Sequence, residues 1–224
     1  MAAPTFKHTT TTTPAAEYIA HAIQTQLRTG KRVLWLVAGG SAMSVAVEAS
    51  KLLHNTPVQN LAVSITDERY GDVGHPNSNW QQLLDAGFTL PGATLVPVLY
   101  GGDTAATTQR FANMLQTAIT AAGYRIGLFG IGPDGHTAGI LPRSESVDQQ
   151  ALACAYDGGT YSRITMTVPA IAAIDEAVAY VMGEQKWPAM DRLQTNLSIA
   201  EQPAQALKKA KKFTVFSDYQ KGKA

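Results

Sequence analysis

Apolar runs that end in glycine or in charged residues recur along the chain and predict the strands of a sheet. Three of them, residues 32–40, 124–132 and 176–183, are almost continuously apolar, which is typical of strands buried on both faces of a parallel sheet. The other runs are shorter, end in charges or contain a proline. They predict further strands at residues 61–71, 93–101, 162–171 and 212–218.

Segments with apolar residues at helical spacing lie between the predicted strands. In the first segment, Ile19, Ile23 and Leu27 fall on one face of a helix that we expect to begin at Pro14 and to stop at Gly30. Helices are also predicted at residues 41–53, 76–87, 103–123, 184–194 and 203–212. This alternation favours a doubly wound, Rossmann-like α/β fold, with a mainly parallel sheet and helices on both faces.

The domain organisation follows from the length and from one low-complexity run. A chain of 224 residues suits one domain, and no repeat or long linker divides it. The threonines of residues 9–13 are typical of an extended or mobile segment. We therefore expect residues 1–13 to be a flexible N-terminal lead-in and residues 14–224 to form a single α/β domain, present as a monomer or a small homo-oligomer.

Composition and charge limit the partners that the chain can have. A net charge of +1 provides no overall field to attract nucleic acid or an anionic membrane, so anion binding must be local. The lysines of residues 208–212 fit a solvated helix end better than a nucleic-acid site. No apolar run approaches ~20 residues and the N-terminus lacks an apolar signal region, so we expect a cytoplasmic protein with no membrane partner. The single cysteine, Cys154, excludes an internal disulfide and a cysteine-based zinc site, and we expect it to be buried.

The first candidate for a site is the glycine loop after the first buried run. In open α/β sheets, ligands bind beyond the carboxyl ends of the strands. Gly39, Gly40 and Ser41 follow such a strand and open a helix, where free N–H groups and a hydroxyl can hold a phosphate. A simple turn explains the same residues equally well, so both interpretations stay open.

Charged residues follow other predicted strands. Asp67, Glu68 and Arg69 end the second strand, and Arg69 can hold a phosphate or carboxylate with one of the acids orienting it. The alternative is a surface ion pair. Arg163 precedes an alternating strand and Lys186 lies one turn into a helix, and each is otherwise an ordinary surface cation. Together with the glycine loop, these cations predict an anion site at one sheet edge.

Residues 130–142, GIGPDGHTAGILP, allow two interpretations. Their Gly-x-Gly-x-x-Gly spacing is that of a dinucleotide-binding turn, but Pro142 leaves no room for a long helix and Asp134 would place a negative charge beside a pyrophosphate. The other interpretation uses His136 as a general base, oriented by the carboxylate two residues before it. We favour the second interpretation, and the sequence shows no set of residues typical of a metal site.

In this order, these motifs resemble the 6-phosphogluconolactonase family, within a larger group that includes the glucosamine-6-phosphate deaminases. The resemblance covers nearly the whole chain after the threonine run. Its markers are VAGGSAMS, ITDERY followed by NSNW, LFGIGPDGHTAGILP, RITMTVPAI and VMGEQK. The deaminase version usually carries a glutamate a few residues beyond the histidine, where residues 139–141 are Gly-Ile-Leu. The resemblance therefore favours the lactonase.

The chain departs from the family pattern at two places. The first loop of the family usually reads Gly-Gly-Ser-Thr-Pro, and Ala42 and Met43 stand here in place of the last two residues. One hydroxyl is lost, which puts the phosphate affinity of this loop in question. The family often has a glycine after the closing proline, where this chain has Arg143. This arginine is either a further phosphate contact or a solvated side chain.

The resemblance implies hydrolysis of 6-phospho-D-glucono-1,5-lactone to 6-phospho-D-gluconate in the pentose phosphate pathway, without a cofactor. His136 would act as the general base on water, and Asp134 would orient it. Arg69, or backbone N–H groups near Gly132, would stabilise the oxyanion. The residues expected to bind the substrate and its phosphate are Gly39, Gly40, Ser41, Asp67, Arg163 and Lys186.

Three other functions remain as alternatives. An amino-sugar-phosphate deaminase or isomerase would release ammonia from glucosamine 6-phosphate. A non-catalytic sugar-phosphate sensor would bind a phosphosugar without turnover, although no segment has room for the helix-turn-helix that usually accompanies such domains. A dinucleotide-dependent oxidoreductase would bind a nicotinamide cofactor at the loop of residues 130–142.

Overall fold

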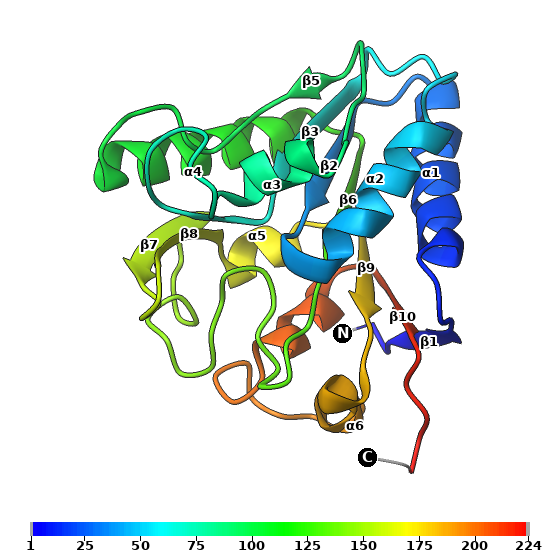
Figure 1. Ribbon diagram of the computed structural model, residues 1–224, viewed down its shortest axis with the longest axis vertical. Helices are drawn as coiled ribbons and strands as arrows, with labels where there is room; N and C mark the ends of the chain where they lie inside the picture. Colours follow the sequence, from blue (N-terminus) through cyan, green and yellow to red (C-terminus); the bar gives the residue numbers. More distant parts are fainter. Residues whose placement is uncertain (1, 223–224) are drawn as a thin grey trace.

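The computed structural model describes residues 2–222 and contains a seven-stranded parallel sheet. In sheet order the strands are β1 (Thr5–His8), β10 (Lys212–Ser217), β9 (Glu176–Val181), β6 (Tyr124–Phe129), β2 (Val33–Val37), β3 (Leu61–Ile65) and β5 (Thr94–Leu95). The helices are α1 (Thr13–Arg28), α2 (Met43–Leu52), α3 (Asn79–Asp85), α4 (Thr104–Ala121), α5 (Val168–Ala172) and α6 (Trp187–Leu193), with 3-10 turns η1 (Gly40–Ala42), η2 (Glu184–Lys186) and η3 (Pro203–Lys209). Helices α1 and α2 lie on one side of the sheet and α4 and α5 on the other (Figure 1). The predicted doubly wound α/β fold is confirmed.

A second, antiparallel sheet joins β4 (Asp67–Arg69), β8 (Ser162–Met166) and β7 (Ala153–Asp157) in that order. The strand predicted at residues 61–71 therefore divides at Thr66, because its charged end leaves the parallel sheet and pairs with β8. Strand β7 carries the buried Cys154, as expected, but it is not among the predicted strands. The run at residues 93–101 keeps only the two residues of β5, since Pro97 cannot donate to a ladder.

Part of the predicted flexible lead-in, residues 1–13, is an edge strand. Strand β1 pairs in parallel with β10, from Thr5 opposite Thr214 to His8 opposite Ser217. Its short sequence TFKH contains one large apolar residue, so it carries no periodic signal, and only the exposed edge of β10 makes it a strand. A continuous described chain then enters α1, which begins at Thr13, one residue before the prediction.

The last predicted helix is also different in the structure. Residues 203–209 form a 3-10 helix, and Lys212 already belongs to β10. Lys208 is 5% exposed and donates from Nζ to the Thr195 carbonyl at 2.8 Å, while Lys212 pairs with Glu176 at 3.0 Å. The prediction of a solvated lysine-rich helix end is therefore wrong for Lys208, which is buried, whereas Lys212 is exposed but lies in β10 and not in a helix.

The strand order places two loops at a topological switch point. Strands β2 and β6 are neighbours in the centre of the sheet. From β2 the chain moves outward through β3 and β5, and from β6 it moves to the other side through β9 and β10. The loops that leave β2 and β6 thus diverge at the carboxyl ends of these strands, and such a divergence opens a crevice for ligands.

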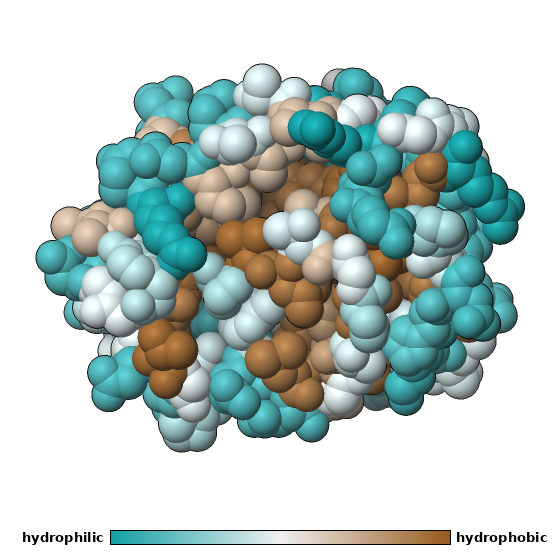
Figure 2. All heavy atoms as spheres, turned by 90° about the horizontal axis from the view of Figure 1, so that it is seen from above, coloured by the Kyte–Doolittle hydropathy of each residue, from teal (hydrophilic) through white to brown (hydrophobic). Residues whose placement is uncertain are grey.

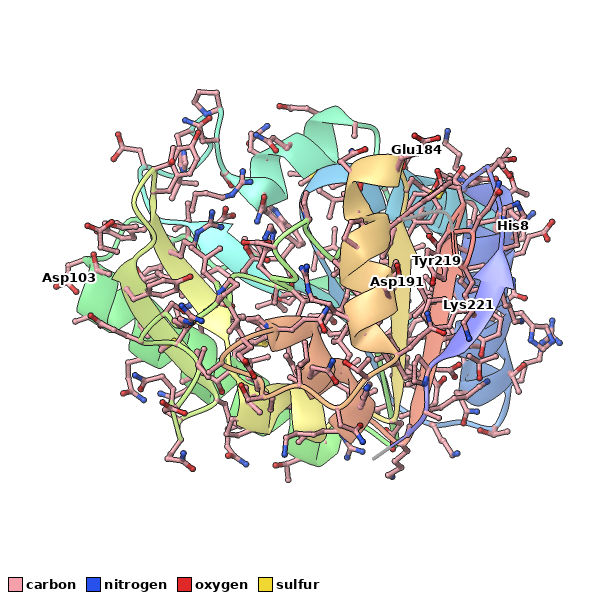
Figure 3. The ribbon with its side chains drawn as sticks, turned by 90° about the horizontal axis from the view of Figure 1, so that it is seen from below. His8, Asp103, Glu184, Asp191, Tyr219 and Lys221 are labelled. Carbon is pink, nitrogen blue, oxygen red and sulfur yellow. The ribbon has the colours of Figure 1, made fainter. Side chains whose placement is uncertain are left out.

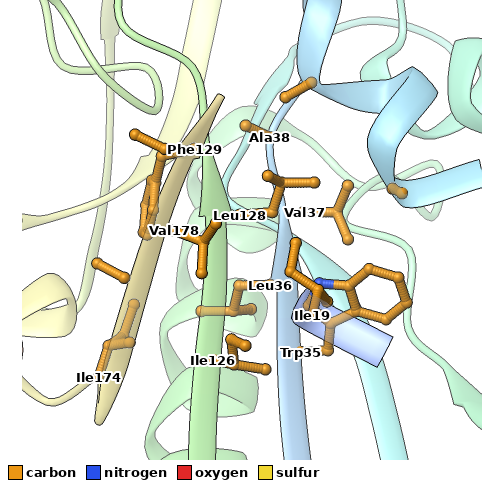
Figure 4. Packing of buried hydrophobic residues seen from close by; sticks show 14 of the residues in the cluster. Ile19, Trp35, Leu36, Val37, Ala38, Ile126, Leu128, Phe129, Ile174 and Val178 are labelled. Atoms are coloured by element: carbon orange, nitrogen blue, oxygen red, sulfur yellow. The ribbon is translucent and has the colours of Figure 1, made fainter. Parts of the chain in front are cut away.

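The core explains why the central strands read as continuous apolar runs. All five residues of β2 are buried, and both faces of the sheet are covered by apolar side chains (Figure 4). Ile19 of α1 packs near Trp35 on one side, and Ile174 lies with Phe129 on the other (Figure 4). Burying one such side chain is worth roughly 1.5–3 kcal/mol, so the sheet is a rigid support for the loops at its end.

The surface at the amino ends of the strands is largely apolar. Figure 2 shows apolar residues gathered around a hollow on this side of the molecule. A groove of about 460 Å³ between α4 and the sheet is lined mainly by small and apolar residues, among them Leu34, Ala62, Val63, Val96 and Met114. This groove contains few groups that could orient a polar ligand, so the charged carboxyl end of the sheet is the better candidate for a site.

Asp175 holds the amino ends of β6 and β9 together, far from that carboxyl end. Its side chain is 13% exposed and accepts from the Arg125 backbone N–H at 2.8 Å, from Arg125 Nη1 at 3.1 Å and from Lys211 Nζ at 2.6 Å. Burial raises the pKa of the Asp175 carboxyl, but these donors outweigh burial and hold the pKa below its ordinary value.

We expect Asp175→Asn to lower the free energy of unfolding by about 2 kcal/mol at pH 7, because charged donors lose their acceptor. A carboxyl with a lowered folded-state pKa stabilises the fold above its unfolded pKa and loses this effect as pH falls through the folded value. The difference from wild type should therefore shrink below about pH 4. Urea unfolding at several pH values, with the exposed Asp148→Asn as control, measures it; a difference that is constant with pH would contradict it.

Candidate active site

The predicted site residues meet in one cavity of about 320 Å³ where β2 and β6 end. Figure 3 looks onto this end of the molecule. The cavity is lined by Ala38, Gly39, Gly40, Ser41, Asp67, Arg69, Asn79, Gly130, Ile131, Gly132, Pro133, His136, Ala138, Arg163 and Lys186. Every predicted site residue except Asp134 belongs to this lining, and Asp134 contacts His136. Five segments that are distant in the sequence thus contribute to one cavity.

Asp134 and His136 form a hydrogen-bonded pair at the cavity. Asp134 Oδ1 accepts from His136 Nδ1 at 2.6 Å and from the His136 backbone N–H at 3.1 Å. With the proton on Nδ1, the other ring nitrogen, Nε2, is free to accept a proton, as a general base requires. Burial raises the pKa of the Asp134 carboxyl, but the hydrogen bonds and the charge of His136 outweigh burial and lower that pKa. Asp134 is therefore an anion that can stabilise an imidazolium.

The loop between β6 and this pair depends on glycine. Gly135 has φ +88°, and a β carbon on Gly132 would lie 2.3 Å from His136 Nδ1, so the imidazole packs directly against the bare Cα. The Gly132 N–H donates to the His136 carbonyl at 3.0 Å. This N–H closes the loop, so the N–H of Gly132 itself is not free for an oxyanion. No helix begins in residues 130–152, which argues against a dinucleotide turn.

The loop after β2 enters α2 through η1. Gly40 adopts φ +68°, and the exposed Ser41 stands in the cavity lining. Ala42 is fully buried and Met43 is 8% exposed, and neither lines the cavity. These two departures from the family pattern are accommodated in the apolar core, while Gly39, Gly40 and Ser41 keep their positions at the cavity.

Two arginines lie side by side in the antiparallel sheet. Arg69 of β4 is the direct partner of Arg163 of β8. Arg69 Nη1 donates to the Asn77 carbonyl at 2.9 Å, and Arg163 Nη1 lies 4.0 Å from Asp67 Oδ2, yet the Nε of each arginine is buried without a partner. Like charges opposite each other destabilise a strand pair, and unpaired buried donors are costly. An anion bound by the two guanidinium groups in the cavity would offset the repulsion between them.

The acids that precede Arg69 do not orient it. Glu68 is fully buried and accepts from Ser78 Oγ at 2.8 Å and from the N–H groups of Asn79 and Trp80, so it binds the start of α3. Asp67 accepts from Asn79 Nδ2 at 3.3 Å and lies nearer to Arg163. The expected Arg69 pairing is therefore wrong, because the pleat of β4 turns Glu68 to the opposite face and Asp67, on the same face as Arg69, lies within 4.0 Å of Arg163 instead.

Asn79 is a cavity residue that the sequence analysis did not select. The residue is 1% exposed. Its Nδ2 donates to the Asp67 carbonyl at 2.9 Å, and its Oδ1 is buried without a hydrogen-bonding partner. Among residues 2–222, three of the four unpaired buried side-chain polar atoms belong to cavity residues. The Oδ1 of Asn79 packs against the Cα of Gly39, so Asn79 supports the glycine loop at the cavity. The NSNW motif was the available signal, but its polar residues also fit a helix cap.

Lys186 enters the cavity from the turn after β9. This turn begins at Gly183, whose φ of +101° favours glycine. Burial lowers the pKa of the Lys186 ammonium, and the negative charge of Asp218 partly opposes this. With Arg69 and Arg163, Lys186 makes the cavity strongly cationic although the whole chain is almost neutral.

Arg143 does not line the cavity and is exposed. Its φ is +58°, which explains why a glycine is common at this place in the family, and its N–H donates to the Ala200 carbonyl at 2.9 Å. We expect Arg143→Gly to raise the free energy of unfolding by about 0.5–1 kcal/mol, since relief of left-handed strain exceeds the added entropy of the unfolded chain. Urea unfolding measures this. Arg143→Ala keeps the strain and should give no gain; an equal gain in both variants would contradict the explanation.

Two further properties concern the described part of the chain as a whole. Residues 2–222 contain no group of three or more His, Cys, Asp or Glu side chains that could hold a metal ion. No helix in this range has the length and apolarity needed to cross a membrane.

The comparison with protein families agrees with the architecture of the site. Residues 7–216 match the sequence profile of the family described as glucosamine-6-phosphate isomerases/6-phosphogluconolactonase. The chain, which has a doubly wound fold and a cationic cavity at its switch point, belongs to this family.

Individual relatives are distant but similar over most of their length. A 6-phosphogluconolactonase of Nostoc sp. is 29% identical over 188 residues, which are 75% of this chain and 74% of the relative. The crystal structure of a 6-phosphogluconolactonase from Shewanella baltica has a TM-score of 0.81 at 22% identity and covers 96% of this chain and 97% of its own. A monomeric glucosamine-6-phosphate deaminase reaches 0.77 at 19% identity, covering 95% and 96%. The fold alone therefore does not separate the two activities.

Proposed function

We propose that this protein hydrolyses 6-phospho-D-glucono-1,5-lactone to 6-phospho-D-gluconate. The observation that carries the proposal is the position of the Asp134–His136 pair beside two arginines with unpaired donors in one cavity. A base for water and cations for the phosphate and the oxyanion are what lactone hydrolysis requires. Several relatives with the name 6-phosphogluconolactonase add support.

In the proposed reaction, His136 Nε2 takes a proton from a water molecule while the water oxygen attacks the lactone carbonyl carbon. Arg69 stabilises the oxyanion of the tetrahedral intermediate. When the intermediate collapses, the bond between the carbonyl carbon and the ring oxygen breaks, and the imidazolium returns its proton to that oxygen. Asp134 stabilises the imidazolium between these steps. Gly39, Gly40, Ser41, Asp67, Arg163 and Lys186 are the proposed binding residues, with the phosphate held by the loop and the cations.

The structure around Gly139 favours the lactonase over the deaminase. A β carbon at Gly139 would lie 2.8 Å from Thr165 Cβ and 3.0 Å from Asp67 Cβ, and the neighbouring Ile140 is fully buried. The segment where the deaminase version carries its glutamate therefore packs against β4 and β8. A longer side chain at Gly139 would clash with these strands, and one at Ile140 would be buried in the core.

The test is to supply purified protein with freshly generated lactone and, in a separate reaction, with glucosamine 6-phosphate. We expect hydrolysis well above the spontaneous rate of the lactone, which is subtracted, and no release of ammonia. Ammonia release would favour the deaminase. Phosphosugar binding without turnover of either compound would favour a sensor.

A further inference from the structure

One carboxylate, Asp218, holds both ends of the turn that carries Lys186 into the cavity. Asp218 directly follows β10, and its two oxygens accept from the Gly183 N–H at 3.0 and 3.2 Å. Its Oδ1 also accepts from the Trp187 indole Nε1 at 3.1 Å. Gly183 lies three residues before Lys186, and Trp187 follows it directly. The turn is therefore tied to the neighbouring strand immediately before and after η2.

The turn has little else to fix its shape. Its own backbone hydrogen bond runs from the Lys186 N–H to the Gly183 carbonyl at 2.9 Å, and η2 contains no buried residue. Gly183 has φ +101°, a conformation that glycine adopts readily, but glycine also loses the most conformational freedom when the chain folds. Because a short 3-10 turn is weakly stabilised by itself, the contacts at its two ends decide where Lys186 points.

The negative charge of Asp218 also favours the protonated form of the partly buried Lys186. Burial lowers the pKa of the Lys186 ammonium, and the Asp218 carboxylate raises it. The cavity side is dominated by cations, since Arg69 and Arg163 line it together with Asp67 and His136. Glu184 lies at the start of the turn. Among the described residues, Lys186 Nζ has no hydrogen-bonding partner or ion pair of its own.

We propose that Asp218 is a positioning residue that presents the Lys186 ammonium to the phosphate of the substrate. This inference rests on the proposed function, because it takes the ligand of Lys186 to be a sugar phosphate. Asp218 lies outside the cavity lining, so it acts through Lys186 and does not touch the substrate.

Asp191, which binds the residue after Asp218, provides a matched control. The Tyr219 hydroxyl donates to Asp191 of α6 (Figure 3) and accepts from Gln194 Nε2 at 2.9 Å. Its ring packs edge-on against Trp187, with the ring centroids 6.4 Å apart. Asp191→Asn therefore perturbs a carboxylate of the same region and the same aromatic pair, but it leaves the contacts of Asp218 with the turn intact.

The experiment compares Asp218→Asn, Lys186→Ala, their double variant and Asp191→Asn. Asparagine removes the charge but keeps one oxygen, which in the place of Oδ1 can still accept from both the Gly183 N–H and the Trp187 indole. We expect Asp218→Asn to raise KM about tenfold with kcat within about twofold, the loss of roughly one charge-assisted contact. In the Lys186→Ala background the same substitution should have no further effect on KM, and Asp191→Asn should leave KM unchanged. Circular dichroism establishes that each variant is folded.

Calorimetric binding of 6-phosphogluconate between pH 7 and 10 separates this inference from the proposed reaction. We expect affinity to fall at a lower pH in Asp218→Asn than in wild type, because loss of the carboxylate lowers the pKa of Lys186. If wild type binds the ligand in this way but turns over no lactone, the reaction is wrong and the role of Asp218 stands. Equal affinities and pH profiles, an additive effect in the double variant, or no phosphosugar binding by wild type would each overturn the inference.

Discussion

His136→Ala is expected to lower kcat for lactone hydrolysis about 10²–10⁴-fold, the usual contribution of a positioned base. The imidazole has a proton affinity suited to taking a proton from water and returning it to the ring oxygen, and Asp134 holds it at 2.6 Å in the required tautomer. KM should change little, because the cations that we assign to the phosphate are untouched. A coupled assay with freshly generated lactone, corrected for spontaneous hydrolysis, measures both constants.

His21→Ala is the control for this substitution. His21 is exposed on α1, away from the cavity, so its removal should leave kcat and KM unchanged. The His136 side chain is 38% exposed, and its replacement should not unfold the protein. If His136→Ala hydrolyses the lactone as fast as wild type, His136 is not the base.

Gly132→Ala should lower kcat by about 10²-fold although it adds a single methyl group. That methyl would lie 2.2 Å from His136 Cε1 and 2.8 Å from Asp134 Oδ1, so the imidazole must move away. A displacement of about 1 Å at a reacting group can cost this much in rate. The free energy of unfolding should fall by only about 1–3 kcal/mol, as is usual for overpacking.

Gly130→Ala is the matched control in the same loop. A β carbon at Gly130 meets no atom within 4 Å, and its φ lies outside the left-handed region. This variant should keep nearly the same stability, and because Gly130 also lines the cavity, its kcat shows what an added methyl group does there without displacing the imidazole. Equal losses in the two variants would mean that the loop, and not the position of the imidazole, responds to the added methyl group.

The sequence alone determined the central layer of the molecule. Strands β2, β6 and β9 are buried on both faces, and such strands must be continuously apolar, so their periodicity is visible without any partner. Helix ends are also predictable from the local sequence. Gly30, with φ +76°, follows the end of α1, and Asp103 accepts from the Ala106 N–H and caps α4. These features depend on neighbours within a few residues.

The cavity was predictable for a related reason. Parallel strands end at the same edge of a sheet, so residues that follow different strands meet there whatever the details of packing. The order of the predicted strands therefore places Ser41, Arg69, His136 and Lys186 at one edge, and all four line the cavity. The assignment of a reaction to them rested on the family resemblance, because the same residue types also serve phosphosugar enzymes of other activities.

Only the tertiary structure decided the contacts between segments that are distant in sequence. Strand β1 exists because β10 offers an open edge, and β4 leaves the main sheet because β8 pairs with it. The unpaired Oδ1 of Asn79 follows from where α3 docks, and the hold of Asp218 on the Lys186 turn follows from the order of β9 and β10. The physical reason is that hydrophobic period and turn chemistry are local, whereas pairing partners and unpaired polar atoms depend on the packing of the whole chain.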